Sequence, residues 1–144
     1  MVAVKKAIYI PVAVLFACIQ TTGFARIGET KAECEARYGA PVQTDGDVVK
    51  YEKEPFIVMI QFDGTGIAEG VILASENAMT KEQVETLVTN NFMGQPVIPL
   101  GNNMWYTPDK SIRAVYDGGN TLNIFTEAYQ NRLEQQQKEQ LQGF

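Results

Sequence analysis

Histidine is absent from this chain of 144 residues, which also contains only two cysteines and one tryptophan. Histidine is the commonest metal ligand and the most frequent general acid–base group in proteins. Its absence removes most acid–base catalysis, histidine-based nucleophilic triads and transition-metal sites. We therefore expect a protein that is not an enzyme, binds no metal and uses no cofactor.

Basic residues are fewer than acidic residues. The chain has 12 Lys and Arg against 17 Asp and Glu, a net charge of −5. A net negative chain without a basic cluster repels nucleic acid and anionic lipid, so we expect no nucleic-acid partner. The content of 45% hydrophobic and 20% charged residues is typical of a globular protein, and the length fits one domain.

Long apolar runs are missing except near the N-terminus. Residues 7–19 are apolar and follow Lys5 and Lys6, and the small residues Gly23 and Ala25 come after them. This run is shorter than the roughly 20 residues that span a membrane. The pattern predicts a cleaved signal peptide over residues 1–25 and a periplasmic or secreted protein.

Cys18 offers an alternative to simple cleavage. The sequence Leu15-Phe16-Ala17-Cys18 resembles the lipid-attachment site of bacterial lipoproteins. Lipidation there would anchor the protein at the cell envelope, and apart from an uncleaved anchor helix over residues 7–19 it is the only route to a membrane that the sequence offers. In either case Cys34 is left without an intramolecular disulfide partner, and we expect it to be a small buried hydrophobic residue.

The sequence contains an internal repeat. Residues 30–33 and 80–83 both begin with threonine and end with Glu or Gln, the pattern of a helix capping box. Residues 39–42 and 94–97 share the pattern Gly-X-Pro-Val, in which X is any residue, and this pattern is typical of a helix end.

The similarity continues beyond the helices. Tyr51 aligns with Tyr106, and residues 62–64 align with residues 116–118, where an aromatic residue precedes Asp-Gly. The shared order of these features predicts two repeats, covering about residues 28–76 and 78–128.

Each repeat has the pattern of one helix followed by short strands with tight turns between them. The expected strands are residues 48–53, 56–62, 67–74, 104–107, 111–116 and 121–126. We expect an α+β domain over residues 26–129, in which two tandem α-β-β-β units form one antiparallel sheet with the helices packed on one face. Residues 130–144 are polar and rich in glutamine, so they predict a helical or disordered tail.

These motifs resemble a known family. Gly28-Glu29-Thr30, a helix, Tyr38-Gly39-Ala40-Pro41, Tyr51 and residues 58–64 follow one another as in the small lipoprotein of the outer-membrane barrel-assembly machinery. Two such units in tandem resemble the architecture of the β-lactamase inhibitor protein. Residues 26–30 and 35–39 are also similar to uncharacterised secreted bacterial proteins. The resemblance covers about residues 27–125 and implies a fold rather than an activity.

The expected strands are apolar on both faces, which two helices on one face cannot cover. We expect five residues to point away from the helices: Ile57, Met59, Trp105, Val115 and Phe125. A large exposed apolar patch is typical of an interaction site, and tryptophan is a frequent anchor in interfaces. The sequence therefore predicts that the helix-free face binds a protein partner or a second copy of the chain. The alternative is that the tail or residues 96–103 cover this face.

Two other functions stay open. Aromatic residues could line a cavity between helices and sheet, which would make the protein a small-ligand carrier. A pair of carboxylates could instead support a secreted hydrolase, although no acidic pair has the placement that hydrolysis requires. We assign no catalytic residue and no metal ligand.

Overall fold

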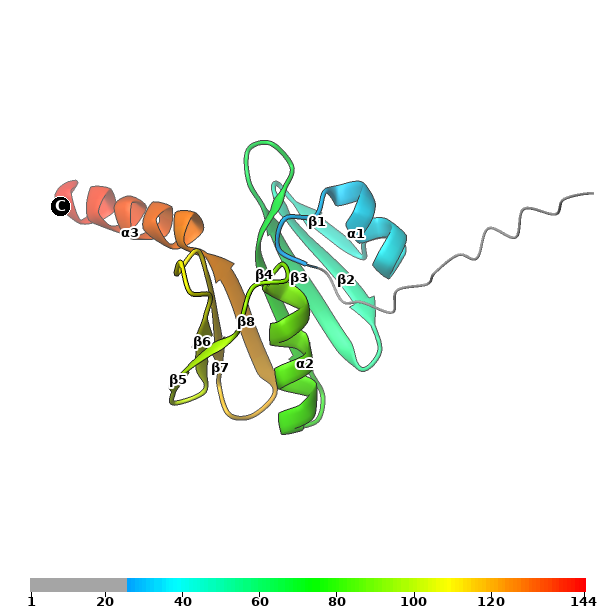
Figure 1. Cartoon of the computed structure of the whole chain (residues 1–144). Helices are drawn as coiled ribbons and strands as arrows, with labels where there is room; N and C mark the ends of the chain where they lie inside the picture. Colours follow the sequence, from blue (N-terminus) through cyan, green and yellow to red (C-terminus); the bar gives the residue numbers. More distant parts are fainter. Residues whose placement is uncertain (1–25) are drawn as a thin grey trace, which may run out of the picture.

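The computed structural model of the chain describes residues 26–144 (Figure 1). The predicted signal peptide over residues 1–25 and the predicted lipid attachment at Cys18 lie outside the described residues. Within residues 26–144, none of the helices has the length and apolar character needed to cross a membrane.

Residues 26–144 form three helices and one eight-stranded antiparallel sheet, which confirms the predicted α+β class. The sheet has the strand order β1-β2-β3-β4-β8-β7-β6-β5. Along the chain the elements are α1 (Lys31–Tyr38), β1 (Gln43–Asp45), β2 (Val48–Lys53), β3 (Phe56–Phe62), β4 (Ala68–Ser75), α2 (Lys81–Asn91), β5 (Ile98–Gly101), β6 (Met104–Tyr106), β7 (Ile112–Tyr116), β8 (Thr121–Thr126) and α3 (Glu127–Gln142).

The two halves of the sheet have the same order of elements, a helix followed by four strands, and they meet where β4 pairs with β8. The prediction of three strands per unit was therefore wrong by one. The additional strands β1 and β5 are the outermost strands of the sheet. They are short and largely exposed, so they lack the apolar alternation by which a strand is recognised in sequence.

Both predicted capping boxes are present. The Thr30 hydroxyl accepts a hydrogen bond from the Glu33 backbone N–H (3.3 Å), and the Glu33 carboxylate accepts one from the Thr30 N–H (2.8 Å). Thr80 and Gln83 make the same reciprocal pair at 3.1 and 2.9 Å. Each box satisfies backbone donors that the first turn of a helix leaves unpaired, which fixes where α1 and α2 begin.

The two aligned Asp-Gly segments form matching hairpin turns. Asp63 Oδ1 accepts hydrogen bonds from the backbone N–H groups two and four residues later, at 2.8 and 3.0 Å. Asp117 Oδ1 makes the same two bonds at 2.8 and 3.1 Å. These backbone donors stabilise the charged carboxylates and hold the pKa of both groups below the usual range.

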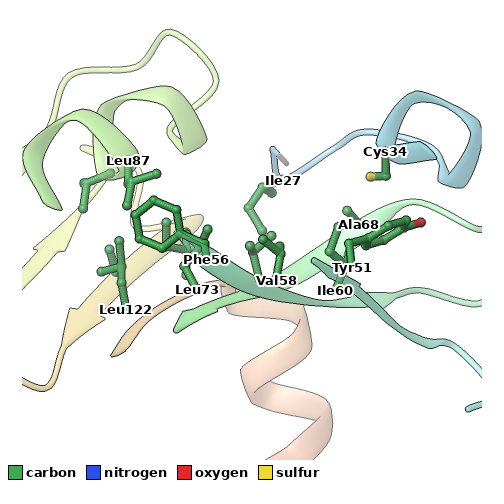
Figure 2. Packing of buried hydrophobic residues seen from close by; sticks show 14 of the residues in the cluster. Ile27, Cys34, Tyr51, Phe56, Val58, Ile60, Ala68, Leu73, Leu87 and Leu122 are labelled. Atoms are coloured by element: carbon green, nitrogen blue, oxygen red, sulfur yellow. The ribbon is translucent and has the colours of Figure 1, made fainter. Parts of the chain in front are cut away.

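The hydrophobic core lies between the sheet and the two helices α1 and α2 (Figure 2). Cys34 of α1 and Leu87 of α2 point toward the sheet, which presents Tyr51, Phe56 and Leu122 among others. Cys34 is fully buried, as predicted. Apolar residues at alternating positions of each strand and on one stripe of each helix thus form a single core.

The tail is the helix α3, which lies on the opposite side of the sheet from α1 and α2 (Figure 2). It begins directly after β8 and runs away from the body of the sheet (Figure 1). Its first turn is half-buried at Tyr129 and Gln130, and every residue from 131 onward is exposed. The prediction that the helices of the two repeats pack on one face is confirmed by α1 and α2, and the predicted tail is the helix α3 on the other side.

Candidate binding groove on the open face

The sheet face opposite α1 and α2, here called the open face, carries a continuous row of mostly apolar side chains. Residues directly opposite each other in neighbouring strands point to the same face. Following the strand register across the sheet gives the row Lys50, Met59, Ile72, Asn123, Val115 and Met104. Met59 is 37% exposed and Ile72 is 36% exposed, so part of this row is in contact with solvent.

A glycine in the next row makes room for α3. Gly70 of β4 lies between Gln61 and Phe125 in the strand register. A side-chain carbon at Gly70 would come within 3.3 Å of the Tyr129 ring and 3.4 Å of Gln61 Cβ. The absence of that carbon lets the first turn of α3 pack directly on the sheet.

An ion pair in the same region fixes α3. The pairing of β3 with β4 shifts register between Gln61 and Phe62, which leaves Glu69 as the additional, bulged residue. The Glu69 side chain is only 7% exposed, and its carboxylate pairs with the Arg132 guanidinium of α3. The Arg132 guanidinium also lies 5.6 Å from the centre of the Tyr129 ring. The bulge therefore provides a buried negative charge to which α3 is attached.

Between α3 and the open face is a groove of about 560 Å³. Its floor comes from β3, β4, β7 and β8, and its wall from α3; the side chains that face it include Met59, Ile72, Val115, Phe125, Tyr129 and Leu133. A volume of this order is typical of sites that bind a small molecule or a few residues of a peptide.

The polar groups of the groove are mainly side-chain amides. Gln61 donates a hydrogen bond to the backbone oxygen of Phe62 at 2.8 Å. Asn123 lies in the middle of the apolar row, and within residues 26–144 nothing hydrogen-bonds to its side chain. Among the residues that the structure describes, the lining includes no carboxylate, lysine, arginine or cysteine. Among these described residues, the Tyr129 phenol is the group that can take part in acid–base chemistry, and the rest of the lining can hold an apolar partner.

Four of the five predicted partner-binding residues are on the open face. Met59, Val115 and Phe125 line the groove. Ile57 is 40% exposed and lies two residues before Met59 in β3, so it belongs to the neighbouring row on the same face. In that row it pairs with Glu52 of β2. The structure therefore brings these four side chains to the surface on which sequence reasoning placed them.

The predicted orientation of Trp105 was wrong. Trp105 pairs with Ala114, and Ala114 pairs with Ile124. Ala114 and Ile124 are buried on the side of α1 and α2, and Trp105 is half-buried against the same core. Trp105 is therefore part of the core and not of the open face.

The error has a simple origin in the repeat alignment. Val58 in the first half and Ile112 in the second half are equivalent positions. Tyr51 pairs with Val58, whereas the residue that pairs with Ile112 is Thr107 and not Tyr106. The aligned tyrosines are thus one residue out of register. Because side chains alternate between faces, a slip of one residue exchanges the two sides of a strand.

Sequence reasoning missed several contributors to the groove, among them Ile72, Asn123, Tyr129 and Leu133. Ile72 lies in β4, which is apolar on both faces and so gives no indication of which residues point outward. Tyr129 and Leu133 are four residues apart and therefore share one face of α3. This spacing indicates an apolar side of the tail helix and could have predicted the contact with the sheet. The glutamine-rich composition of the tail made the spacing hard to recognise.

The acidic residues considered for hydrolysis and the aromatic residues considered for ligand binding lie outside the groove, apart from Phe125 and Tyr129. Within the described part of the chain, no three Cys, Asp or Glu side chains gather closely enough to hold a metal ion. Aromatic residues between the helices and the sheet, among them Tyr51, Phe62 and Phe92, are fully buried in the core.

Comparisons with known proteins add little to this description. No protein-family model matches the sequence, and no curated protein matches it. Among solved structures, the chain is similar to a DUF4309 family protein (YjgB) from Bacillus subtilis subsp. subtilis str. 168. The identity is 13% and the TM-score 0.41, over 75% of this chain and 85% of that one. The functional interpretation therefore depends on the groove itself.

Proposed function

We propose that this protein is an exported, non-catalytic module of the bacterial cell envelope that docks a protein partner through the open face. The observation that carries the proposal is the exposure of the apolar row on the open face. The side chains of Met59 and Ile72 in this row are each more than a third exposed, and the row forms the floor of a groove of about 560 Å³. Leaving such surface in water costs free energy, and contiguous apolar patches on soluble proteins are typical of interaction sites.

Two further observations support a binding role. The groove lining lacks carboxylates and other strong acid–base groups, which disfavours a hydrolase. The sheet scaffold is rigidly paired over eight strands, so the groove floor is preformed. A preformed surface lowers the conformational entropy that binding must overcome.

We infer the cellular location from the sequence of residues 1–25. Lys5 and Lys6, the apolar run and the small residues after it support export, with lipid anchoring at Cys18 as the alternative. The intact mass of the protein recovered from cells distinguishes cleavage after Ala25 from a diacylated Cys18. The repeated order of elements also supports an origin by duplication.

Site-specific photo-cross-linking in cells tests the docking role. A photoreactive amino acid at Met59 should produce a discrete cross-linked species. The same group at Leu100, which is 47% exposed on the edge strand β5, should produce none. Identical products from both positions, or no product from Met59, would contradict the proposal. A product with twice the mass of the chain would identify the partner as a second copy.

A further inference from the structure

Asn123 is the feature of the groove that its apolar character does not explain. It lies between Ile72 and Val115 in the strand register, at the centre of the row that forms the groove floor. Its amide has two N–H donors and one carbonyl acceptor, and within residues 26–144 none of them is paired. Any occupant that covers the floor must also satisfy or bury this amide.

This requirement discriminates between classes of occupant. An acyl chain would cover Asn123 without offering a hydrogen bond, and an unpaired buried amide weakens association by roughly tenfold or more. A polypeptide backbone offers a donor and an acceptor side by side, which match the side-chain amide of Asn123. Met59, Ile72 and Phe125 would meanwhile contact apolar side chains of the same polypeptide. The groove therefore favours a polypeptide over a lipid.

The amide also favours an extended segment over a helix. Inside an α-helix the backbone N–H and C=O groups are bonded to each other and cannot pair with Asn123. In an extended segment that lies across a sheet face, both groups are free. The side of the groove formed by Tyr129 and Leu133 spans about one helical turn of α3 and would flank part of such a segment.

Charge at the two sides of the groove indicates what the ends of the segment carry. Lys50 of β2 lies opposite Met59, and Arg113 of β7 lies opposite Phe125. Neither side chain has an ion pair within the described residues. From β2 to β7 there are four strand spacings, about 19 Å, which an extended chain covers with about six residues. Two unpaired cations at this separation complement acidic residues at the ends of the segment.

We propose that the groove binds an extended, apolar segment of a partner protein, about six residues long with acidic ends, whose backbone amide pairs with the Asn123 side chain. The inference rests on the proposed docking function and specifies the chemistry of the partner.

Fluorescence polarisation with the purified protein tests this inference. The first probe is a fluorescein-labelled hexapeptide of sequence Glu-Leu-Val-Leu-Val-Glu. The second is the same peptide with its two central backbone nitrogens methylated, and the third is a fluorescent dodecanoate. We expect the first peptide to bind, the methylated peptide to bind about tenfold more weakly, and dodecanoate to bind least.

Variants at Asn123 separate the two classes of occupant. Asn123→Leu should weaken binding of the first peptide about tenfold and should leave binding of the methylated peptide unaffected. The control is Asn77→Leu, at an exposed position outside the groove, which should change the binding of neither peptide. Asn123→Ala provides the same comparison with a smaller side chain. Tighter binding of dodecanoate to Asn123→Leu, with no loss of peptide binding, would overturn the inference in favour of an acyl chain.

The charge argument has its own control. Lys50→Glu should weaken binding of the peptide with glutamate ends and leave a peptide with glutamine ends unaffected. Equal effects on the two peptides would contradict the proposed acidic ends.

The outcomes also separate this inference from the proposed function. If none of the peptides binds but Met59 still forms its specific cross-link in cells, the partner chemistry is wrong and the docking role stands. If Met59 forms no cross-link and no peptide binds, both proposals fail.

Discussion

At the scale of single residues, burial determines the chemistry of the core beneath α1. Burial raises the pKa of the Cys34 thiol from its ordinary value of 9.0 to about 12, and that of the Tyr51 phenol to about 12. The pKa of Tyr38 is raised by the same cause. The rings of Tyr38 and Tyr51 lie 5.3 Å apart, and both phenols interact electrostatically with the Cys34 thiol, so the three groups form one cluster. A thiol with such a pKa is a poor nucleophile, which agrees with a structural role for Cys34.

These raised pKa values predict a loss of stability in alkali. Between about pH 9 and 12 the folded protein keeps protons that the unfolded chain releases. The stability contribution is therefore fully present below about pH 9 and decreases as the pH rises toward 12. Urea unfolding at pH 7, 9 and 10.5 should show this decrease, and Cys34→Ala should make it shallower. A constant free energy of unfolding over this range, or modification of native Cys34 by iodoacetamide at pH 8, would contradict the account.

Trp105 and Tyr106 provide a direct comparison of the two sheet faces, because they are neighbours in β6 and point to opposite sides. Trp105→Ala removes packing against the core and should lower the free energy of unfolding by about 2 kcal/mol. Tyr106→Ala should cost less than about 1 kcal/mol, because its side chain lies on the open face. Urea unfolding of both variants measures the difference. A larger loss for Tyr106→Ala would place the core on the other face.

At the scale of elements, α3 depends on a few contacts made by its first two turns. Tyr129 packs over Gly70, and Arg132 pairs with the buried carboxylate of Glu69. The remaining turns are exposed, so the helix has little else to hold it. Since α3 forms one wall of the groove, these contacts also determine the shape of the groove.

Removing one partner of the ion pair should loosen α3. Arg132→Met leaves the Glu69 carboxylate buried without a counter-charge, which we expect to cost about 1–2 kcal/mol. The double variant Glu69→Gln with Arg132→Met should recover part of this loss, because no buried charge remains. Hydrogen exchange in residues 127–133, together with urea unfolding, measures the effect. Equal exchange in the single variant and the parent protein would show that the pair does not hold α3.

The elements that follow local rules could be predicted from the sequence. Thr30 and Thr80 fix the starts of α1 and α2, and Asp63 and Asp117 fix the hairpin turns, because each of these residues bonds to backbone within four positions. The edge strands β1 and β5 were missed because pairing with a neighbour, not their own pattern, makes them strands.

The groove was only partly predictable for a different reason. Met59 and Val115 follow from the alternation within one strand, whereas the face of Trp105 depends on strand register, which a single sequence does not determine. The position of α3 depends on Gly70 and Glu69, which lie far from it in the chain. Only the folded arrangement shows that a missing side chain and a bulged carboxylate create the place where this helix packs.

At the scale of the whole molecule, residues 26–144 form an eight-stranded sheet with one face covered by α1 and α2, and among these residues only α3 flanks the other face. Within the described residues, Met59 and Ile72 of the apolar row on the open face are therefore in contact with solvent. The proposed role and the proposed partner chemistry both depend on this face being open when the protein is free.

The free energy of unfolding of Ile72→Lys tests that central claim most directly. Ile72 and Val71 are neighbours in β4, but Val71 is buried in the core and Ile72 is 36% exposed. We predict that Ile72→Lys changes the free energy of unfolding by less than about 1 kcal/mol and equally at low and high protein concentration, whereas Val71→Lys prevents folding. A loss of several kcal/mol for Ile72→Lys, or a loss that depends on protein concentration, would show that the open face is already covered.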